Sequence, residues 1–263
     1  MLMLALLVLS GYIFMKPEVC QPAIANTKHN LSVTGPGTIK ATVETEICVF
    51  CHTPHSATTE LPLWNHALTT HNYVPAELPS VSTGWPRLLS TVQPPDKASK
   101  LCLSCHDGTV AIGLLVNMPG PGSSGSVTMQ GTAGGNMPTT AYGYIGTNLS
   151  GTHPVSIAVN DTLINDKNLC TTPGAYTLQY PPAGDPVKLK PTSNTYKGGT
   201  GKPVTTATAF TYFQGVQCTS CHDPHLEGVV DFLVKGTGSP APTKGHPGNI
   251  SALCTSCHPG TCP

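Results

Sequence analysis

The segment ICVFCHTPHSA, residues 47–57, holds two cysteines and two histidines close together. Cys48, Cys51 and His52 form the pattern C-x-x-C-H. This pattern is typical of a c-type haem site, in which both cysteines form thioether bonds to the porphyrin and the histidine binds the iron from one side. His55 follows three residues later, and the attachment motif does not explain it.

The same pattern occurs three more times in the chain. The further copies are Cys102, Cys105 and His106; Cys218, Cys221 and His222; and Cys254, Cys257 and His258. With 11 Cys and 11 His in 263 residues, chance would give about 0.02 copies. Zinc sites also use C-x-x-C pairs, but they place two pairs about 15–20 residues apart or add a spaced histidine pair. The motif starts here are 54, 116 and 36 residues apart (48 to 102, 102 to 218, 218 to 254), which favours four haems c.

The N-terminus predicts export, which thioether attachment of haem outside the cytoplasm requires. Residues 2–15 form an apolar run, and Ala23 and Ala25 provide an A-x-A cleavage site. We therefore expect residues 1–25 to be a cleaved signal peptide and residues 26–263 to be a single tetrahaem domain. An uncleaved anchor is the alternative, although this run is short for a membrane span. The mature chain has no other apolar stretch long enough to cross a bilayer.

Three of the 11 cysteines lie outside the motifs, namely Cys20, Cys170 and Cys262. Cys20 would leave with the signal peptide. In an oxidising compartment the other two are expected to form a disulfide that ties the C-terminal tail to the middle of the chain. The alternative is two unrelated thiols.

The composition predicts a multihaem cytochrome c fold: mostly coil, with short helices and a few short strands wrapped around four stacked haems. Charged residues make up only 10% of the chain, aromatic residues 6%, and there are 27 Gly and 26 Pro. Such a chain builds a poor conventional core, so the apolar faces of the haems would have to supply one. We expect helical turns after each motif, especially over residues 102–116, and strands around residues 207–217.

A second histidine follows two of the motifs after a proline, in CHTPH and CHDPH. His55 and His225 lie too close to their own motifs to reach the far side of the same haem easily. Pro54 and Pro224 stiffen the connection. We therefore predict that each second histidine binds the iron of a neighbouring haem, which would bring two haems into close approach. A solvent-facing histidine is the alternative.

Four six-coordinate irons need four distal ligands. The predicted distal ligands are His29, His55, His153 and His225, with His66 in reserve. His71 and His246 are expected at the surface. Methionine ligation by Met118, Met129 or Met137 is the weaker alternative, because histidines are plentiful.

Six segments in order, TKHNLS, CVFCHTPH, LWNH, CLSCHDGTVAIG, HPVS and CHDPH, give the chain a family resemblance. It resembles the tetrahaem cytochromes of metal-reducing bacteria and some archaea that polymerise into extracellular filaments, the outer-surface cytochrome E type. The resemblance implies a bis-histidine haem array continued from subunit to subunit, with one haem completed by a histidine of the next subunit. By this resemblance His29 takes the inter-subunit role. The Cys262 tail, GTCP, departs from the family pattern.

The charge pattern agrees with self-association and argues against nucleic-acid binding. The formal net charge is zero, and Arg87 is the only arginine. A nearly uncharged coat does not oppose self-association, and a head-to-tail contact that does not close gives a filament.

The expected function is therefore electron transfer without catalysis. The protein would be a secreted, extracellular or cell-surface filament that receives electrons from other c-type cytochromes and delivers them to an extracellular acceptor. A soluble periplasmic tetrahaem shuttle is the alternative. A multihaem reductase is less favoured, because it needs an iron with an open coordination position.

Overall fold

The computed structural model describes residues 23–57, 63–74, 94–118, 125–165, 177–193, 203–205, 211–226, 232–235 and 251–260. This part of the chain is mostly coil with short helices and strands, as the composition predicts. The four-haem interior stays a prediction. Most of the expected signal peptide, residues 1–22, lies outside the described residues, as do Cys170, Cys262 and His246.

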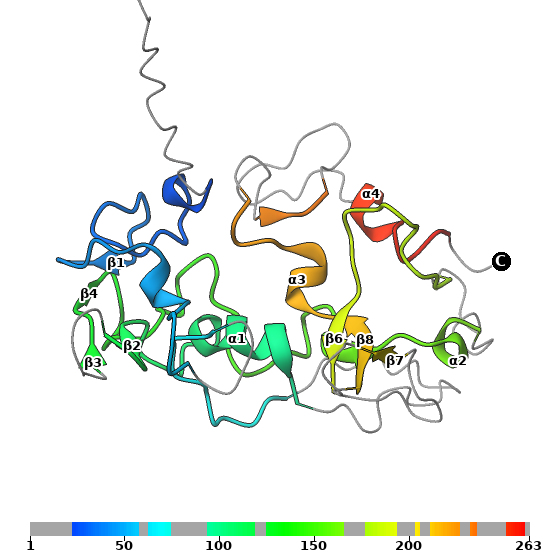
Figure 1. The fold of residues 1–263 in the computed structure, drawn as a ribbon, viewed down its shortest axis with the longest axis horizontal. Coiled ribbons are helices and arrows are strands. Elements are labelled where there is room, and N and C mark those ends of the chain that lie inside the picture. The colour runs from blue at the N-terminus through cyan, green and yellow to red at the C-terminus, as the bar shows by residue number, and fades with distance from the viewer. Residues whose placement is uncertain are drawn as a thin grey trace, which may run out of the picture.

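All four C-x-x-C-H motifs begin or end on a short helix. The helices are η1 (Ala23–Asn26), η2 (Cys48–Phe50), α1 (Lys97–His106), α2 (Asp161–Ile164), α3 (Cys218–Cys221) and α4 (Ser251–Cys254). The motifs lie on η2, α1, α3 and α4. In Figure 1, α1, α3 and α4 follow one another along the long axis of the molecule.

The expectation of helical turns after the motifs is wrong in position. The longest helix, α1, begins at Lys97, upstream of its motif, and ends at His106. It stops there because Gly108 adopts a left-handed backbone with φ of 72°. After the other three motifs a proline follows the histidine within two residues and disfavours further helix.

The strands form three small antiparallel sheets. They are β1 (Lys40–Ala41), β2 (Leu114–Leu115), β3 (Gly125–Ser126), β4 (Met129–Gln130), β5 (Ile157–Ala158), β6 (Lys190–Thr192), β7 (Pro203–Thr205) and β8 (Thr211–Val216). β1 pairs with β4, and β2 pairs with β3. β8 pairs with β5, β6 and β7, and leads through Gln217 directly into α3. The strand expected around residues 207–217 is therefore confirmed over Thr211–Val216.

The apolar interior is divided into three small clusters. The first contains Ala41, Phe50, Leu115 and Val127, from segments around the first two motifs. The second is built on Val159 and Leu163, and the third on Val187, Leu233 and Leu253. No single core joins these clusters in the described part of the chain.

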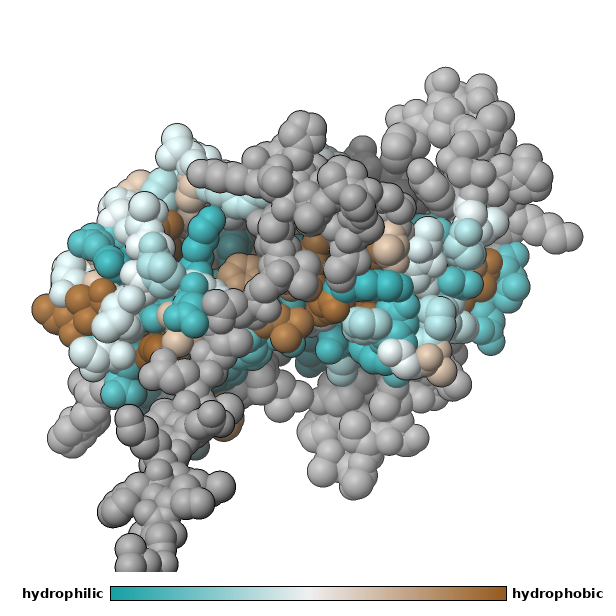
Figure 2. Space-filling view, turned by 90° about the horizontal axis from the view of Figure 1, so that it is seen from above, coloured by the Kyte–Doolittle hydropathy of each residue, from teal (hydrophilic) through white to brown (hydrophobic). Residues whose placement is uncertain are grey.

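The surface also carries its apolar residues in small patches. On the face seen in Figure 2, brown residues lie among hydrophilic ones. Val43 and Tyr142 are 77% and 57% exposed. Among the described residues, no helix has the length and apolar character needed to cross a membrane.

Candidate haem-binding sites

A tight backbone turn brings the cysteines and the histidine of a motif together. In the first motif the amides of Cys51 and His52 donate to the Cys48 carbonyl at 3.1 and 2.8 Å. The third and fourth motifs repeat the bond from the histidine amide to the first cysteine carbonyl, at 3.0 and 2.8 Å. All eight motif cysteines are free thiols, so none is used in a disulfide.

The residue before the second cysteine anchors each motif in the fold. It is serine in three motifs, at Ser104, Ser220 and Ser256, and all three are buried. Ser104 Oγ donates to the Leu101 carbonyl at 2.6 Å, and Ser220 Oγ accepts from the Gln217 amide at 3.0 Å. In the first motif the position is Phe50, which belongs to the first apolar cluster.

Three of the four motif histidines have a ring close to that of a predicted distal histidine of the same chain. The ring centroids are 6.1 Å apart for His52 and His225, 6.0 Å for His106 and His29, and 6.3 Å for His258 and His153. A metal–nitrogen bond of about 2.0 Å plus about 1.1 Å from nitrogen to ring centroid puts two imidazoles on opposite sides of one metal about 6.2 Å apart. The three spacings therefore fit an iron held between each pair.

Burial keeps several of these imidazoles neutral, the form that binds iron. Burial, reinforced by the neighbouring His106 ring, lowers the pKa of His29 to about 4. Burial also lowers the pKa of His106 and of His258. The buried Nδ1 of His29 has no hydrogen-bond partner within the described part of the chain.

A hydrogen bond favours one tautomer of the His106 ring, in the second motif. His106 Nδ1 lies 2.6 Å from the Gly143 carbonyl oxygen. A neutral ring that donates there carries its lone pair on Nε2, which is then free to bind a metal. His153 Nδ1 has an equivalent bond to the Pro154 carbonyl at 2.8 Å.

The inter-subunit role expected for His29 stays a prediction, and within its own chain His29 has close ring neighbours. Its ring lies against His106 and, at 4.4 Å between centroids, against Phe232. Both neighbours belong to the same chain. His29 is therefore placed to complete a site within its own subunit.

His55 and His225 have different surroundings. The His225 ring is nearly parallel to His52, with 16° between their planes, so the second histidine of the third motif lies beside the first motif. His55 lies at the surface, with Nδ1 3.4 Å from Ser56 Oγ.

The reserve ligand His66 is fully buried beside the second motif. Its Nδ1 and Nε2 lie 2.8 and 3.0 Å from the carbonyl oxygens of Ala67 and Ala111, and Nε2 is 3.6 Å from Cys105 Sγ. Burial lowers the pKa of His66, and a neutral ring can donate to only one of these carbonyls. His66 thus lies next to an attachment cysteine, and its reserve role as an iron ligand stays a prediction.

Three of the remaining histidine and methionine candidates lie at the surface or against an apolar cluster. His71 is exposed. Met118 and Met129 pack against the first apolar cluster, which explains them as core residues.

The four motifs are neighbours in chain order. Burial and the Cys105 thiol raise the pKa of Cys51 to about 12. The first and second motifs therefore lie close enough for their thiols to interact. The thiol of Cys102 hydrogen-bonds with Cys218, which links the second and third. Cys221 and Cys257 pack against the same apolar cluster, which links the third and fourth.

A buried polar network fixes the second motif against the third, and the sequence patterns did not reveal it. Gln217 Nε2 donates to Asp96 Oδ1 at 2.8 Å, while Gln217 Oε1 accepts from the Ser99 amide at 3.1 Å and also from the Ser99 hydroxyl. Ser99 Oγ in turn accepts from the Cys218 amide at 3.0 Å. Thr192 Oγ1 donates to Asp96 at 3.0 Å and joins β6 to the network. Two attachment motifs distant in sequence are thus held by the same few side chains.

No protein-family model and no curated protein matches the chain. In the described residues, no group of three or more His, Cys, Asp or Glu side chains is arranged to hold a bare metal ion.

Proposed function

We propose that the protein transfers electrons through four c-type haems. The observation that carries this proposal is the agreement of two independent features. The sequence contains four C-x-x-C-H motifs, and three of their histidine rings lie 6.0–6.3 Å from a second histidine ring, a spacing that fits one iron between two imidazoles.

In this proposal the residues have distinct roles. The eight motif cysteines hold the porphyrins through thioether bonds, and His52, His106, His222 and His258 are the proximal ligands. His225, His29 and His153, whose rings lie near those of His52, His106 and His258, would be the distal ligands. His55 is the remaining distal candidate. When bound, each haem supplies an iron that gains and loses one electron.

The protein's own contribution is to keep the ligand positions constant. Buried, neutral imidazoles with a fixed tautomer can bind the iron in both oxidation states. Two histidines held in place at each haem would leave little to rearrange when the iron gains or loses an electron. They would also fill the position that a substrate would need, which disfavours a reductase.

We propose further that the subunits assemble into an extracellular filament that carries electrons to an acceptor outside the cell. This step rests on the family resemblance and on the zero formal charge. Since His29 faces His106 in its own subunit, His55 is the histidine that we assign to the subunit contact, because it lies at the surface next to a motif. A soluble periplasmic shuttle with the same haems is the alternative.

Two measurements test the proposal. The intact mass of the secreted protein should exceed that of the polypeptide by four haems, and the reduced protein should bind very little carbon monoxide at neutral pH. A mass equal to the bare chain would refute the haem assignment, and stoichiometric carbon monoxide binding would indicate an open iron. Negative-stain microscopy of the extracellular fraction separates a filament from a shuttle.

A further inference from the structure

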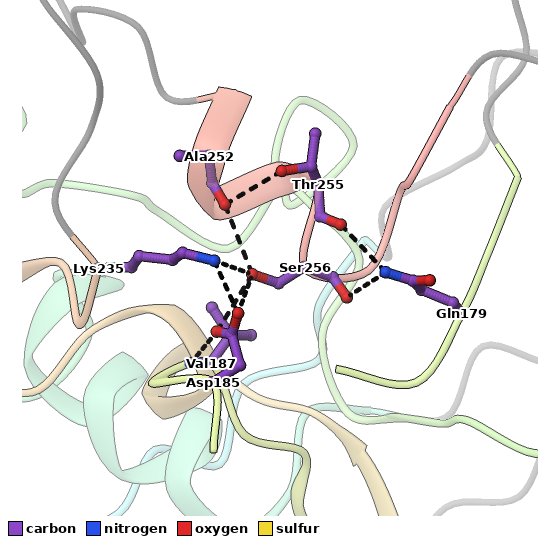
Figure 3. Close-up of polar contacts among 7 residues, drawn as sticks. All are labelled: Gln179, Asp185, Val187, Lys235, Ala252, Thr255 and Ser256. Carbon is purple, nitrogen blue, oxygen red and sulfur yellow. Dashed lines mark hydrogen bonds and ion pairs between the residues drawn. The ribbon is translucent and has the colours of Figure 1, made fainter. Parts of the chain in front are cut away.

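An ion pair contacts the fourth attachment motif. Lys235 Nζ lies 2.7 Å from Asp185 Oδ2. Both side chains meet at the hydroxyl of Ser256, which accepts from Lys235 at 2.9 Å and donates to the Asp185 carboxylate at 3.1 Å. Figure 3 shows the three side chains converging, with the ion pair on one side of the Ser256 hydroxyl.

Ser256 connects this ion pair to the haem site. It lies between Cys254 and Cys257, and Gln179 Nε2 holds the Ser256 carbonyl at 3.3 Å from the other side. Ser256 is only 2% exposed, so its hydroxyl is not available as a nucleophile for a substrate. Cys257 directly follows Ser256 in the chain, so the ion pair lies beside the second attachment cysteine.

Asp185 is the less exposed residue of the ion pair. The Asp185 side chain is 10% exposed and that of Lys235 is 28% exposed. Asp185 Oδ1 also accepts from the Val187 amide at 2.9 Å, so the carboxylate is held by several donors. Charges in such a place are screened less than charges at an open surface, and their effect on a nearby redox centre is larger.

We propose that Asp185 and Lys235 set the reduction potential of the haem attached at Cys254 and Cys257, an inference that rests on the proposed function. Reduction adds one electron to the iron and lowers the charge of the site by one. A negative neighbour stabilises the oxidised site, and a positive neighbour stabilises the reduced site. In the intact pair the two effects oppose each other, so this potential depends on both residues.

The test uses the holoprotein and follows all four centres by a redox titration that reads the haem methyl signals in the proton NMR spectrum. Lys235→Gln leaves the Asp185 charge unopposed, so the potential of one of the four centres should fall. Asp185→Asn leaves Lys235 unopposed, and the potential of the same centre should rise. Lys235→Arg is the matched control that keeps the charge, and it should leave the potential near the original value.

The opposite signs separate an electrostatic role from a structural one. A role limited to holding the motif would move the potential in the same direction in both variants, or lower the melting temperature alone, and either result overturns the inference. If a single variant fails to mature, the neutral pair Asp185→Asn with Lys235→Gln should give a potential between the two single-variant values and near the original. A large shift in this double variant contradicts the proposal. Four haems by mass with no opposite shifts would refute this inference alone, whereas missing haems in the unaltered protein would refute the proposed function.

Discussion

The imidazole rings of His52 and His225 lie nearly parallel, with centroids 6.1 Å apart and planes inclined by 16°. These histidines come from the first and third attachment motifs. In the proposed haem array, one turn of the third motif would therefore serve two sites, with His222 in one and His225 in the other. The shared turn couples the positions of both sites.

Replacing His225 with alanine should open one iron. We expect one of the four centres in His225→Ala to become high spin and to bind carbon monoxide when reduced, because His52 loses the ring opposite it. Optical and EPR spectra measure the change. His71→Ala is the control, since His71 is exposed, and all four centres should stay low spin. Equal spectra for the two variants would contradict the assignment.

Replacing His29 separates an internal ligand from an inter-subunit one. In isolated subunits, His29→Ala should convert one centre to high spin, because His29 faces His106 in the same chain at 6.0 Å. In isolated subunits, His55→Ala should give the same spin states as the unaltered protein. The reason is that His55 is assigned to a site that is completed only when subunits assemble. If His29→Ala leaves every isolated subunit unchanged but prevents assembly, His29 has the inter-subunit role after all.

A methyl group at Gly143 should disturb the second site. A Cβ added there would lie 3.1 Å from both Nδ1 and Cε1 of His106, so the ring would have to move by a few tenths of an ångström. We expect Gly143→Ala to cost about 1–3 kcal/mol in unfolding free energy and to alter the EPR signal of one centre. Gly151→Ala is the matched control, because nothing lies within 4 Å of its added Cβ. The prediction fails if both glycine variants behave alike.

Gln217→Ala should destabilise the contact between the second and third motifs. It leaves the buried Ser99 hydroxyl and the Asp96 carboxylate with fewer partners, at a cost of about 2 kcal/mol. Denaturant unfolding of the holoprotein measures the loss. Gln130→Ala removes the same side chain from an exposed position and should change stability by less than about 0.5 kcal/mol. Equal stability of the two variants would show that the network contributes little.

The sequence alone suggests the attachment residues and the candidate distal histidines, because these depend on local motifs and on residue type, and both assignments stay predictions. Histidines cannot be matched from sequence alone, since His29 and His106 meet through a fold with little periodicity. The resemblance suggested a subunit-bridging role for His29, and the sequence could not show that this residue lies near His106 of the same chain. The Asp96–Gln217 network was equally hidden, because isolated polar residues in coil carry no recognisable pattern before the chain brings them together. The sequence predicted a helix that continues beyond Gly108, whereas α1 ends at His106 because Gly108 adopts a left-handed backbone conformation.

The division of the apolar interior has a consequence for how the protein is made. The first cluster is built from residues between Ala41 and Val127, so the N-terminal part can begin to condense before the later segments have been made. His52, in contrast, can meet His225 only after most of the polypeptide has been made. The earliest attachment site to emerge would thus wait for a late segment before it is closed, and a chain truncated after residue 217 would keep that site permanently open.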